Sequence, residues 1–238
     1  NKRVQALGGA KNHMIVMPDA DVSHVRDALI GSAFGSAGER CMAVSVAVCV
    51  GKETADSVRD AVSEAAQKLN VGPYTDGDAD FGPLSSEIHM NKVVSYIDKG
   101  VAEGADLVVD GRNLNLQGYE KGYFVGPTVF DRVTSDMTIY KEEIFGPVLG
   151  IVRCSSYSDA VSLVDNHELG NGAALFTNDG GVSRHFVEKT QIGMVGVNVP
   201  IPVPVAYHSF GGWKRSLFGD HHMHCLLYTS DAADEEDS

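Results

Sequence analysis

The chain has 238 residues, of which 43% are hydrophobic and 21% charged, enough for one large domain or two small ones with a buried core. Its 19 basic and 32 acidic residues leave a formal net charge of −13, the wrong sign for binding nucleic acid or an anionic membrane through bulk charge. The cysteines form no CxxC pair, which favours a reducing, cytoplasmic location. The apolar runs are far shorter than the roughly 18 residues of a membrane-spanning helix, so we expect no membrane partner.

Helical and extended periods alternate along the chain. Predicted strands lie at residues 14–17, 44–50, 107–109, 148–152, 173–176 and 194–197. Predicted helices lie at residues 22–33, 58–69, 88–101, 160–166 and 182–189. Asp19 or Asp21 offers an N-cap to the first helix. Strands that alternate with helices predict an α/β fold, a wound and mainly parallel sheet with helices on both faces.

The segment Phe34 to Ala43 (FGSAGERCMA) joins a predicted helix to a buried strand and contains Cys41 directly after Arg40. A cationic neighbour and free backbone N–H groups favour the thiolate form of a cysteine, and the same N–H groups can bind a developing oxyanion. Most cysteines simply pack in the interior, which is our interpretation of Cys49 and Cys154 inside apolar strands. On this pattern alone Cys41 is a candidate nucleophile, and a packing cysteine is the alternative.

A second loop, Glu142 to Pro147 (EEIFGP), places two carboxylates before an aromatic residue and a Gly-Pro turn, directly ahead of a predicted core strand. Loops at strand ends often line the sites of wound α/β folds, although an acidic pair in a turn is more often a solvated surface. The segment 210–214 (FGGWK) is a weaker signal of the same kind. The chain contains neither GxGxxG nor GxxxxGK[ST], so these residues predict no nucleotide-binding domain.

Taken in order, the segments are more specific than any one of them. They are Leu7 to Asn12 (LGGAKN), Gly38 to Met42 (GERCM), Phe124 to Thr128 (FVGPT), Glu142 to Pro147, Asn198, and Ser209 to Lys214 (SFGGWK). In order and spacing they resemble the aldehyde dehydrogenase superfamily. Within it, segments 9–13, 38–43 and 196–204 resemble the CoA-acylating methylmalonate-semialdehyde dehydrogenases, and the resemblance runs from about Val4 to His224.

The resemblance implies the catalytic domain of an NAD-dependent enzyme. By matching motif, Cys41 attacks the aldehyde, forms a thiohemiacetal and becomes a thioester once hydride has passed to NAD. Its backbone N–H forms half of an oxyanion hole, whose other half is an asparagine expected upstream of Asn1. Glu143 matches the acid that hydrogen-bonds the nicotinamide ribose, and Phe145 matches the ring that packs near the nicotinamide. Both residues would position the cofactor.

The sequence departs from the pattern of hydrolytic family members at Leu7, where those enzymes carry a glutamate that activates water. A leucine cannot act as a general base. The resemblance therefore implies that coenzyme A takes the acyl group, giving propionyl-CoA or acetyl-CoA from methylmalonate or malonate semialdehyde, with loss of CO2. Arg40 suits a substrate with its own carboxylate because a guanidinium donates two charge-assisted hydrogen bonds to it. A structural ion pair with a partner such as Glu39 is the alternative.

We expect residues 1–224 to hold the catalytic domain and the start of the return segment, without the upstream NAD-binding domain, so that this chain alone is inactive. Residues 225–238 look like translated sequencing adaptor, with a genuine acidic tail as the alternative. His221, His222 and His224 fall inside the family match, where no metal is expected. The resemblance also implies a homo-oligomer, a tetramer, for the full-length protein.

Two other functions stay open. One is a hydrolytic aldehyde dehydrogenase with an unrecognised base, which would release acid without coenzyme A. The other is a catalytically inactive module that binds partners through the surface where the nucleotide domain should dock. The dependence of turnover on coenzyme A separates the first alternative from thiolysis. The reactivity of the Cys41 thiol separates the second from an enzyme.

Overall fold

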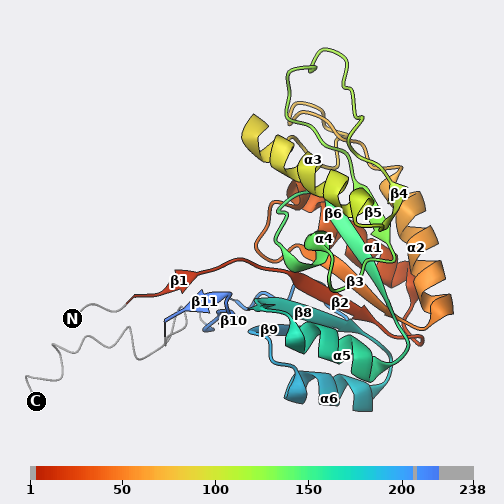
Figure 1. The fold of residues 1–238 in the computed structure, drawn as a ribbon, viewed down its shortest axis with the longest axis vertical. Coiled ribbons are helices and arrows are strands. Elements are labelled where there is room, and N and C mark those ends of the chain that lie inside the picture. The colour runs from red at the N-terminus through yellow and green to blue at the C-terminus, as the bar shows by residue number, and fades with distance from the viewer. Residues whose placement is uncertain (1–3, 206–207, 220–238) are drawn as a thin grey trace, which may run out of the picture.

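The protein, a computed structural model that describes residues 4–205 and 208–219, is built around one seven-stranded sheet (Figure 1). Its strands are β2 (Asn12–Val16), β3 (Val44–Val50), β4 (Asp106–Val109), β5 (Thr128–Asp131), β6 (Val148–Cys154), β8 (Gly172–Phe176) and β9 (Met194–Val197). Their order is β4-β5-β6-β3-β2-β8-β9, and every neighbouring pair is parallel except β4 with β5. The predicted wound, mainly parallel α/β fold is confirmed.

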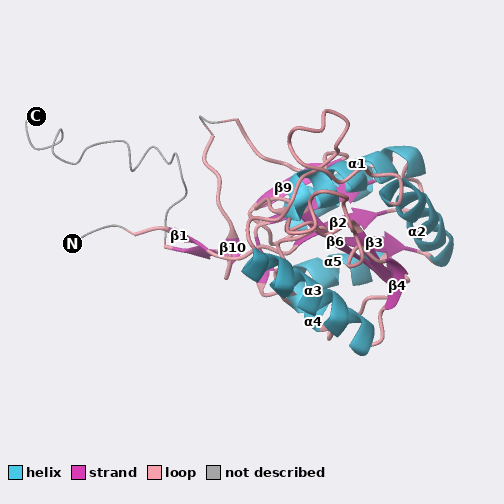
Figure 2. Cartoon of the chain, turned by 90° about the horizontal axis from the view of Figure 1, so that it is seen from above, coloured by secondary structure: helices cyan, strands magenta, loops and turns pink. Residues whose placement is uncertain are grey.

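Helices cover both faces of the sheet. They are α1 (Val22–Phe34), α2 (Lys52–Ala66), α3 (Glu87–Ala102), α4 (Thr138–Lys141), α5 (Tyr157–Asn166) and α6 (Gly180–Lys189), with a 3-10 turn η1 (Gly35–Gly38) after α1. Helices α1 and α2 pack together on one face, whereas α3, α4 and α5 lie on the other (Figure 1 and Figure 2). In the described ranges, no helix combines the length and apolarity that crossing a membrane requires.

The start of α1 shows which of two predicted caps the chain uses. The Asp21 carboxylate accepts hydrogen bonds from the backbone N–H groups of Ser23 (2.8 Å) and His24 (3.1 Å), two of the donors that a helix leaves unpaired at its start. Asp19 instead accepts from the Thr177 hydroxyl at 2.9 Å, beyond the end of β8. The cap is therefore Asp21, and Asp19 ties two loops together.

The central strands are buried on both faces, as their composition predicted. Every residue of β2 is buried, and in β3 only Ser45 is partly exposed. Burial raises the pKa of Cys49 in β3 to about 12 and that of Cys154 at the end of β6 to about 11. Both therefore stay thiols at neutral pH, in agreement with the prediction that they only pack.

Several short elements were not predicted. They are β5, α4 and the paired two-residue strands β1 (Ala6–Leu7) with β11 (Leu217–Phe218) and β7 (Leu169–Gly170) with β10 (Trp213–Lys214). Runs of two to four residues are too short to show a period. The predicted boundary at residue 224, the tail 225–238, and His221, His222 and His224 lie outside the described residues.

The sheet order decides which loops meet. Strands β6, β3, β2 and β8 are adjacent and parallel, so their amino ends lie side by side at one edge of the sheet. The loops that precede these strands carry the sequence motifs, from Leu7 to Lys11, Gly38 to Ala43 and Glu142 to Pro147. The common rule places sites of open α/β sheets at the carboxyl ends of strands, whereas here the motifs gather at the amino ends.

Candidate functional site

A cavity of about 520 Å³ opens where these loops meet, and all four predicted site residues line it: Arg40, Cys41, Glu143 and Phe145. The other lining residues are Leu7, Gly8, Ala10, Met42, Asn171, Met194, Ile201, Val203, Phe210, Gly211 and Ser216. The lining is mostly apolar with a few polar groups, which is typical of sites for small molecules and cofactors. We call residues 38–43 the cysteine loop and residues 142–147 the cofactor loop.

Cys41 lies exposed in a tight turn that the Ala43 N–H closes by donating to the Arg40 carbonyl at 3.1 Å. The carbonyl of Cys41 accepts from the side-chain amides of Asn12 and Asn171, both at 2.9 Å. Within the described residues, the N–H of Cys41 donates to no other group. The turn therefore exposes Cys41 at the cavity and leaves its N–H without an internal partner in the described residues, which suits a nucleophile with an oxyanion-binding donor.

The approach to this turn has an unusual backbone. Ser36 and Ala37 both have φ of 54°, and Gly38 follows with φ of 72°. A Cβ at Gly38 would lie 2.2 Å from the Gly146 carbonyl oxygen, so only glycine fits there. The cysteine loop thus touches the cofactor loop backbone to backbone. Such strained residues persist only where the surrounding structure holds them, and they cluster at functional sites.

Glu143 places its carboxylate against the loop before β2. Its Oε1 atom accepts a hydrogen bond from the Ala10 N–H at 3.1 Å, and Oε2 makes no hydrogen bond within the described residues. Just behind it, the buried Lys11 donates from Nζ to the Glu142 carbonyl at 2.9 Å. Burial lowers the pKa of Lys11 to about 7, against the attraction of Glu143 and Glu142. The sequence analysis quoted Lys11 within a motif and assigned it no role.

Arg40 does not form the alternative ion pair with Glu39. Its Nη2 atom donates to the carbonyls of Gly31 (2.5 Å) and Ser32 (3.0 Å) in the last turn of α1, whose carbonyls have no partner within the helix. Glu39 instead accepts from the Ser85 hydroxyl at 2.9 Å. The Arg40 Nε atom is buried without a partner in the described structure, and burial lowers the pKa of the guanidinium. Arg40 therefore supports the helix end beside Cys41.

Sequence reasoning missed the amides that hold the cysteine loop. Asn12 was quoted in a motif without a role, and Asn171 was not noticed, because a single asparagine ahead of a strand has no periodic signal. Asn198, which carries part of the resemblance, lies elsewhere. It has φ of 55°, and its side chain pairs with Thr177, accepting from the N–H and donating to the carbonyl at 3.0 Å each. Asn198 thus has a structural role at the end of β8 and β9.

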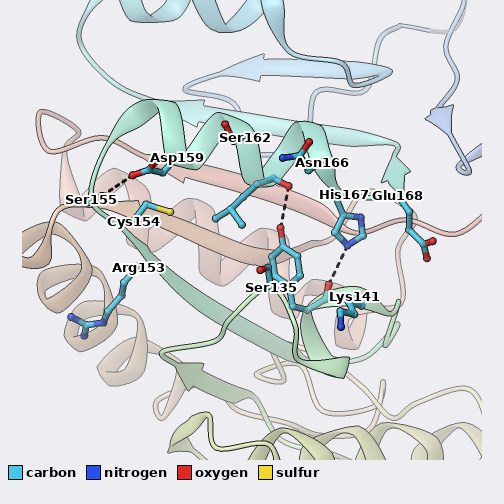
Figure 3. A pocket seen from close by; sticks show the side chains of 12 residues that line it. Ser135, Lys141, Arg153, Cys154, Ser155, Asp159, Ser162, Asn166, His167 and Glu168 are labelled. Carbon is cyan, nitrogen blue, oxygen red and sulfur yellow. Dashed lines mark hydrogen bonds between the residues drawn. The ribbon is translucent and has the colours of Figure 1, made fainter.

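A larger cavity of about 780 Å³ lies between α5 and the segment that carries α4 (Figure 3). Several of its polar groups are already paired: the Tyr140 hydroxyl donates to the Leu163 carbonyl at 3.2 Å, and His167 Nε2 donates to the Tyr140 carbonyl at 3.3 Å (Figure 3). Arg153 is bound to Asp131, and Cys154 is the thiol whose pKa burial raises. This cavity therefore offers no activated nucleophile, and the smaller one is the candidate site.

The comparisons with known proteins agree with this geometry. The profile of the aldehyde dehydrogenase family matches residues 1–229. The chain belongs to the aldehyde dehydrogenase family. It is 57% identical to malonate-semialdehyde dehydrogenase of Pseudomonas aeruginosa, over 94% of this chain and 45% of that protein. It is 48% identical to malonate-semialdehyde dehydrogenase of Halalkalibacterium halodurans, over 93% of this chain and 45% of that protein.

Solved structures give the same result. A protein from Sinorhizobium meliloti 1021 assigned as methylmalonate-semialdehyde dehydrogenase, in complex with NAD, superposes with a TM-score of 0.93 at 58% identity. Methylmalonate-semialdehyde dehydrogenase from Oceanimonas doudoroffii superposes with a TM-score of 0.90 at 56% identity. The chain is covered over 94% and 92% of its length, and each matched chain over 45%. The family resemblance predicted from the motifs is confirmed, and the chain spans about half the length of these relatives.

Proposed function

We propose that this chain carries the catalytic half of an NAD-dependent, CoA-acylating semialdehyde dehydrogenase that acts on malonate or methylmalonate semialdehyde. The observation that carries the proposal is the meeting of Cys41, Glu143 and Phe145 in one cavity at the amino ends of the central strands. The names of the relatives support the substrate class, and the complex of the Sinorhizobium protein with NAD supports the cofactor.

Cys41 is the proposed nucleophile. Its sulfur attacks the aldehyde carbon, and the oxygen that becomes negative is bound by the free N–H of the same residue. Asn12 and Asn171 hold the Cys41 carbonyl, so the turn that carries the thiol stays fixed while the sulfur reacts. The oxidation leaves the acyl group on the sulfur as a thioester.

The residues present fit the nicotinamide end of NAD, which supplies the hydride acceptor when bound. The Oε2 atom of Glu143 is an unused acceptor at the cavity, suited to a ribose hydroxyl, while Oε1 is held by Ala10. Phe145 contributes an apolar ring to the same wall. Both orient the cofactor against Cys41, and neither takes part in bond making.

Coenzyme A is the proposed acceptor of the acyl group. Leu7 lines the cavity where a water-activating carboxylate would be needed, and Glu143 is the one carboxylate among the lining residues of the described structure. A Glu143 engaged by Ala10 and by cofactor is poorly placed to activate water. The thioester therefore persists until the thiolate of coenzyme A attacks it and releases Cys41. Loss of CO2 from the substrate then gives acetyl-CoA or propionyl-CoA.

Arg40 is proposed to bind the substrate carboxylate. Its Nη2 atom is engaged by α1 and its Nε atom is buried, so the carboxylate would be bound through the remaining donor group, Nη1. Arg40 lines the same cavity as Cys41 and is its neighbour in the chain. The structural support of α1 holds the group in place for that contact.

The decisive experiment replaces Cys41 in the full-length protein that contains this chain. Cys41→Ala should abolish the acyl-enzyme and NADH formation, while Cys154→Ala, at a half-buried thiol outside this cavity, should leave both intact. Product formation in the wild type should require coenzyme A. Substantial turnover of Cys41→Ala would reject the nucleophile, and acid release without coenzyme A would favour the hydrolytic alternative. An unreactive Cys41 in the wild type would favour an inactive binding module.

We propose further that the chain alone binds NAD weakly and is inactive. Glu143 and Phe145 would contact only the nicotinamide end, and the adenine and pyrophosphate sites would belong to an upstream domain. Calorimetry of the isolated chain should detect no micromolar affinity, and a micromolar Kd would contradict this proposal.

Residues 225–238 are also proposed to be foreign sequence. The family profile extends to residue 229, five residues into this segment, so resequencing of the source locus is needed to test where the native sequence ends.

Assembly into a homo-oligomer, a tetramer, is also a proposal. Large apolar side chains are exposed on the β1–β11 ribbon and near it, at Val4 (61%), Leu7 (55%) and Phe218 (71%). The ribbon extends away from the sheet (Figure 1). Proteins rarely leave such apolar area to water, so we expect other parts of the full-length protein or a second subunit to cover it. Light scattering of the full-length protein tests the oligomeric state.

A further inference from the structure

A third element connects the two loops of the site. Helix α3 packs beside the cofactor loop, where a Cβ at Gly146 would come within 2.6 Å of Val93. The segment just before α3 also approaches the cysteine loop, because Glu39 accepts hydrogen bonds from the N–H (3.2 Å) and hydroxyl (2.9 Å) of Ser85. The loops that carry Cys41 and Phe145 therefore share one neighbour.

His89 makes the closest of these contacts. Its Nε2 atom lies 2.6 Å from the Phe145 carbonyl oxygen and 3.3 Å from the Glu39 carboxylate. Both neighbours can only accept hydrogen bonds, so Nε2 carries the proton and donates it to the Phe145 carbonyl, with the Glu39 carboxylate beside it. The side chain of His89 is only 15% exposed. The backbone N–H of His89 donates to the hydroxyl of Ser86, the cap of α3, at 3.2 Å. The helix cap therefore fixes the backbone of His89, and the Phe145 carbonyl holds its imidazole.

The acceptor of this hydrogen bond is a strained residue. Phe145 has φ of 60°, a left-handed conformation that is unfavourable for a residue with a Cβ and so needs external support. The bond from His89 fixes the direction of the Phe145 carbonyl, and the two rings meet edge to face with centroids 6.2 Å apart. Without this donor, the peptide could relax toward a right-handed conformation, which would move the ring that lines the cavity.

We propose that His89 is a positioning residue that holds Phe145 in its left-handed conformation and ties the cofactor loop to Glu39, two residues before Cys41. In this way His89 sets the alignment between the nicotinamide and the carbon bound to Cys41. The inference rests on the proposed function, because it assumes that Phe145 packs on the cofactor. His89 does not line the cavity and touches neither reactant.

The test uses the full-length protein, three substitutions of His89 and one control variant. His89→Leu removes the donor at similar volume. His89→Gln keeps an N–H that can reach the Phe145 carbonyl, whereas His89→Asn has the same amide one methylene shorter and cannot reach it. Ser85→Ala, which loses a contact to Glu39 without touching Phe145, is the matched control. The Gln and Asn pair keeps the test decisive if the Leu variant fails to fold.

The readout is the pre-steady-state burst of NADH with normal and 1-deuterated aldehyde. At saturating NAD, His89→Leu and His89→Asn should slow the burst about 10- to 100-fold and increase the deuterium isotope effect, since hydride transfer becomes rate-limiting. His89→Gln and Ser85→Ala should stay within about threefold of the wild type. Equal bursts in the Gln and Asn variants, or a burst of wild-type rate in His89→Leu, would overturn the inference alone. A burst that persists in Cys41→Ala would overturn the proposed function.

Discussion

Replacing Lys11 by methionine should change how the stability of this protein depends on pH. The ammonium is 2% exposed, and Nζ donates to the Glu142 carbonyl at 2.9 Å. Burial lowers its pKa from 10.5 to about 7 in the folded chain. Between these two values the unfolded chain holds a proton that the folded chain has released. The free energy of unfolding therefore rises with pH across this window.

The size of the effect follows from the same two values. Each tenfold difference in proton affinity corresponds to 1.36 kcal/mol, so a fall from 10.5 to about 7 corresponds to about 5 kcal/mol over the whole window. Between pH 7 and 9.5 the Lys11 contribution amounts to about 3 kcal/mol. The penalty for burying the charge is complete below pH 7 and disappears as pH rises above 10.5. Methionine replaces the aliphatic part of the side chain out to Cε and has no proton to release.

The assay is urea unfolding of the wild type and Lys11→Met from pH 7 to pH 9.5, followed by circular dichroism. The difference in unfolding free energy between the two proteins should shift by about 3 kcal/mol in favour of the wild type across this range. Lys68→Met, at an exposed lysine paired with Glu64, controls for the loss of a lysine as such. Parallel curves for wild type and Lys11→Met, within about 0.5 kcal/mol, would show that folding does not lower the pKa of Lys11.

Three further substitutions test the site and its support. In the full-length protein, Arg40→Leu should lower kcat/KM for a carboxylate-bearing semialdehyde about 30- to 150-fold more than for propanal. An equal fall in kcat/KM for both substrates would show that Arg40 only supports α1 and does not bind the substrate carboxylate. Gly38→Ala forces a Cβ against the cofactor loop at φ of 72° and should cost about 1–3 kcal/mol in urea unfolding, whereas Gly31→Ala, with nothing within 4 Å, should not destabilise. Arg153→Met strips the buried Asp131 of its bidentate partner and should cost about 3–5 kcal/mol, and a loss below about 1 kcal/mol would refute that reasoning.

Local patterns in the sequence determined the fold class and the chemistry to look for. The apolar strand 44–50, the alternation of strands with helices, and Asp21 as one of two possible caps follow from periods and side-chain types within a few residues of each other. The order of the motifs identified the family and named Cys41, Arg40, Glu143 and Phe145. None of these inferences needed to know which strands are neighbours.

The tertiary structure decided how these residues meet. Strand β3 lies between β6 and β2, which brings Cys41 and Glu143 to the same edge of the sheet. This arrangement follows from the order and register of the strands, which no local period in the sequence encodes. The guanidinium of Arg40 turned toward α1, and Lys11 was buried behind the cofactor loop. The bond from His89 to the Phe145 carbonyl joins residues 56 positions apart. Such contacts arise only when distant segments pack, because burial and hydrogen-bond geometry are properties of the packed chain.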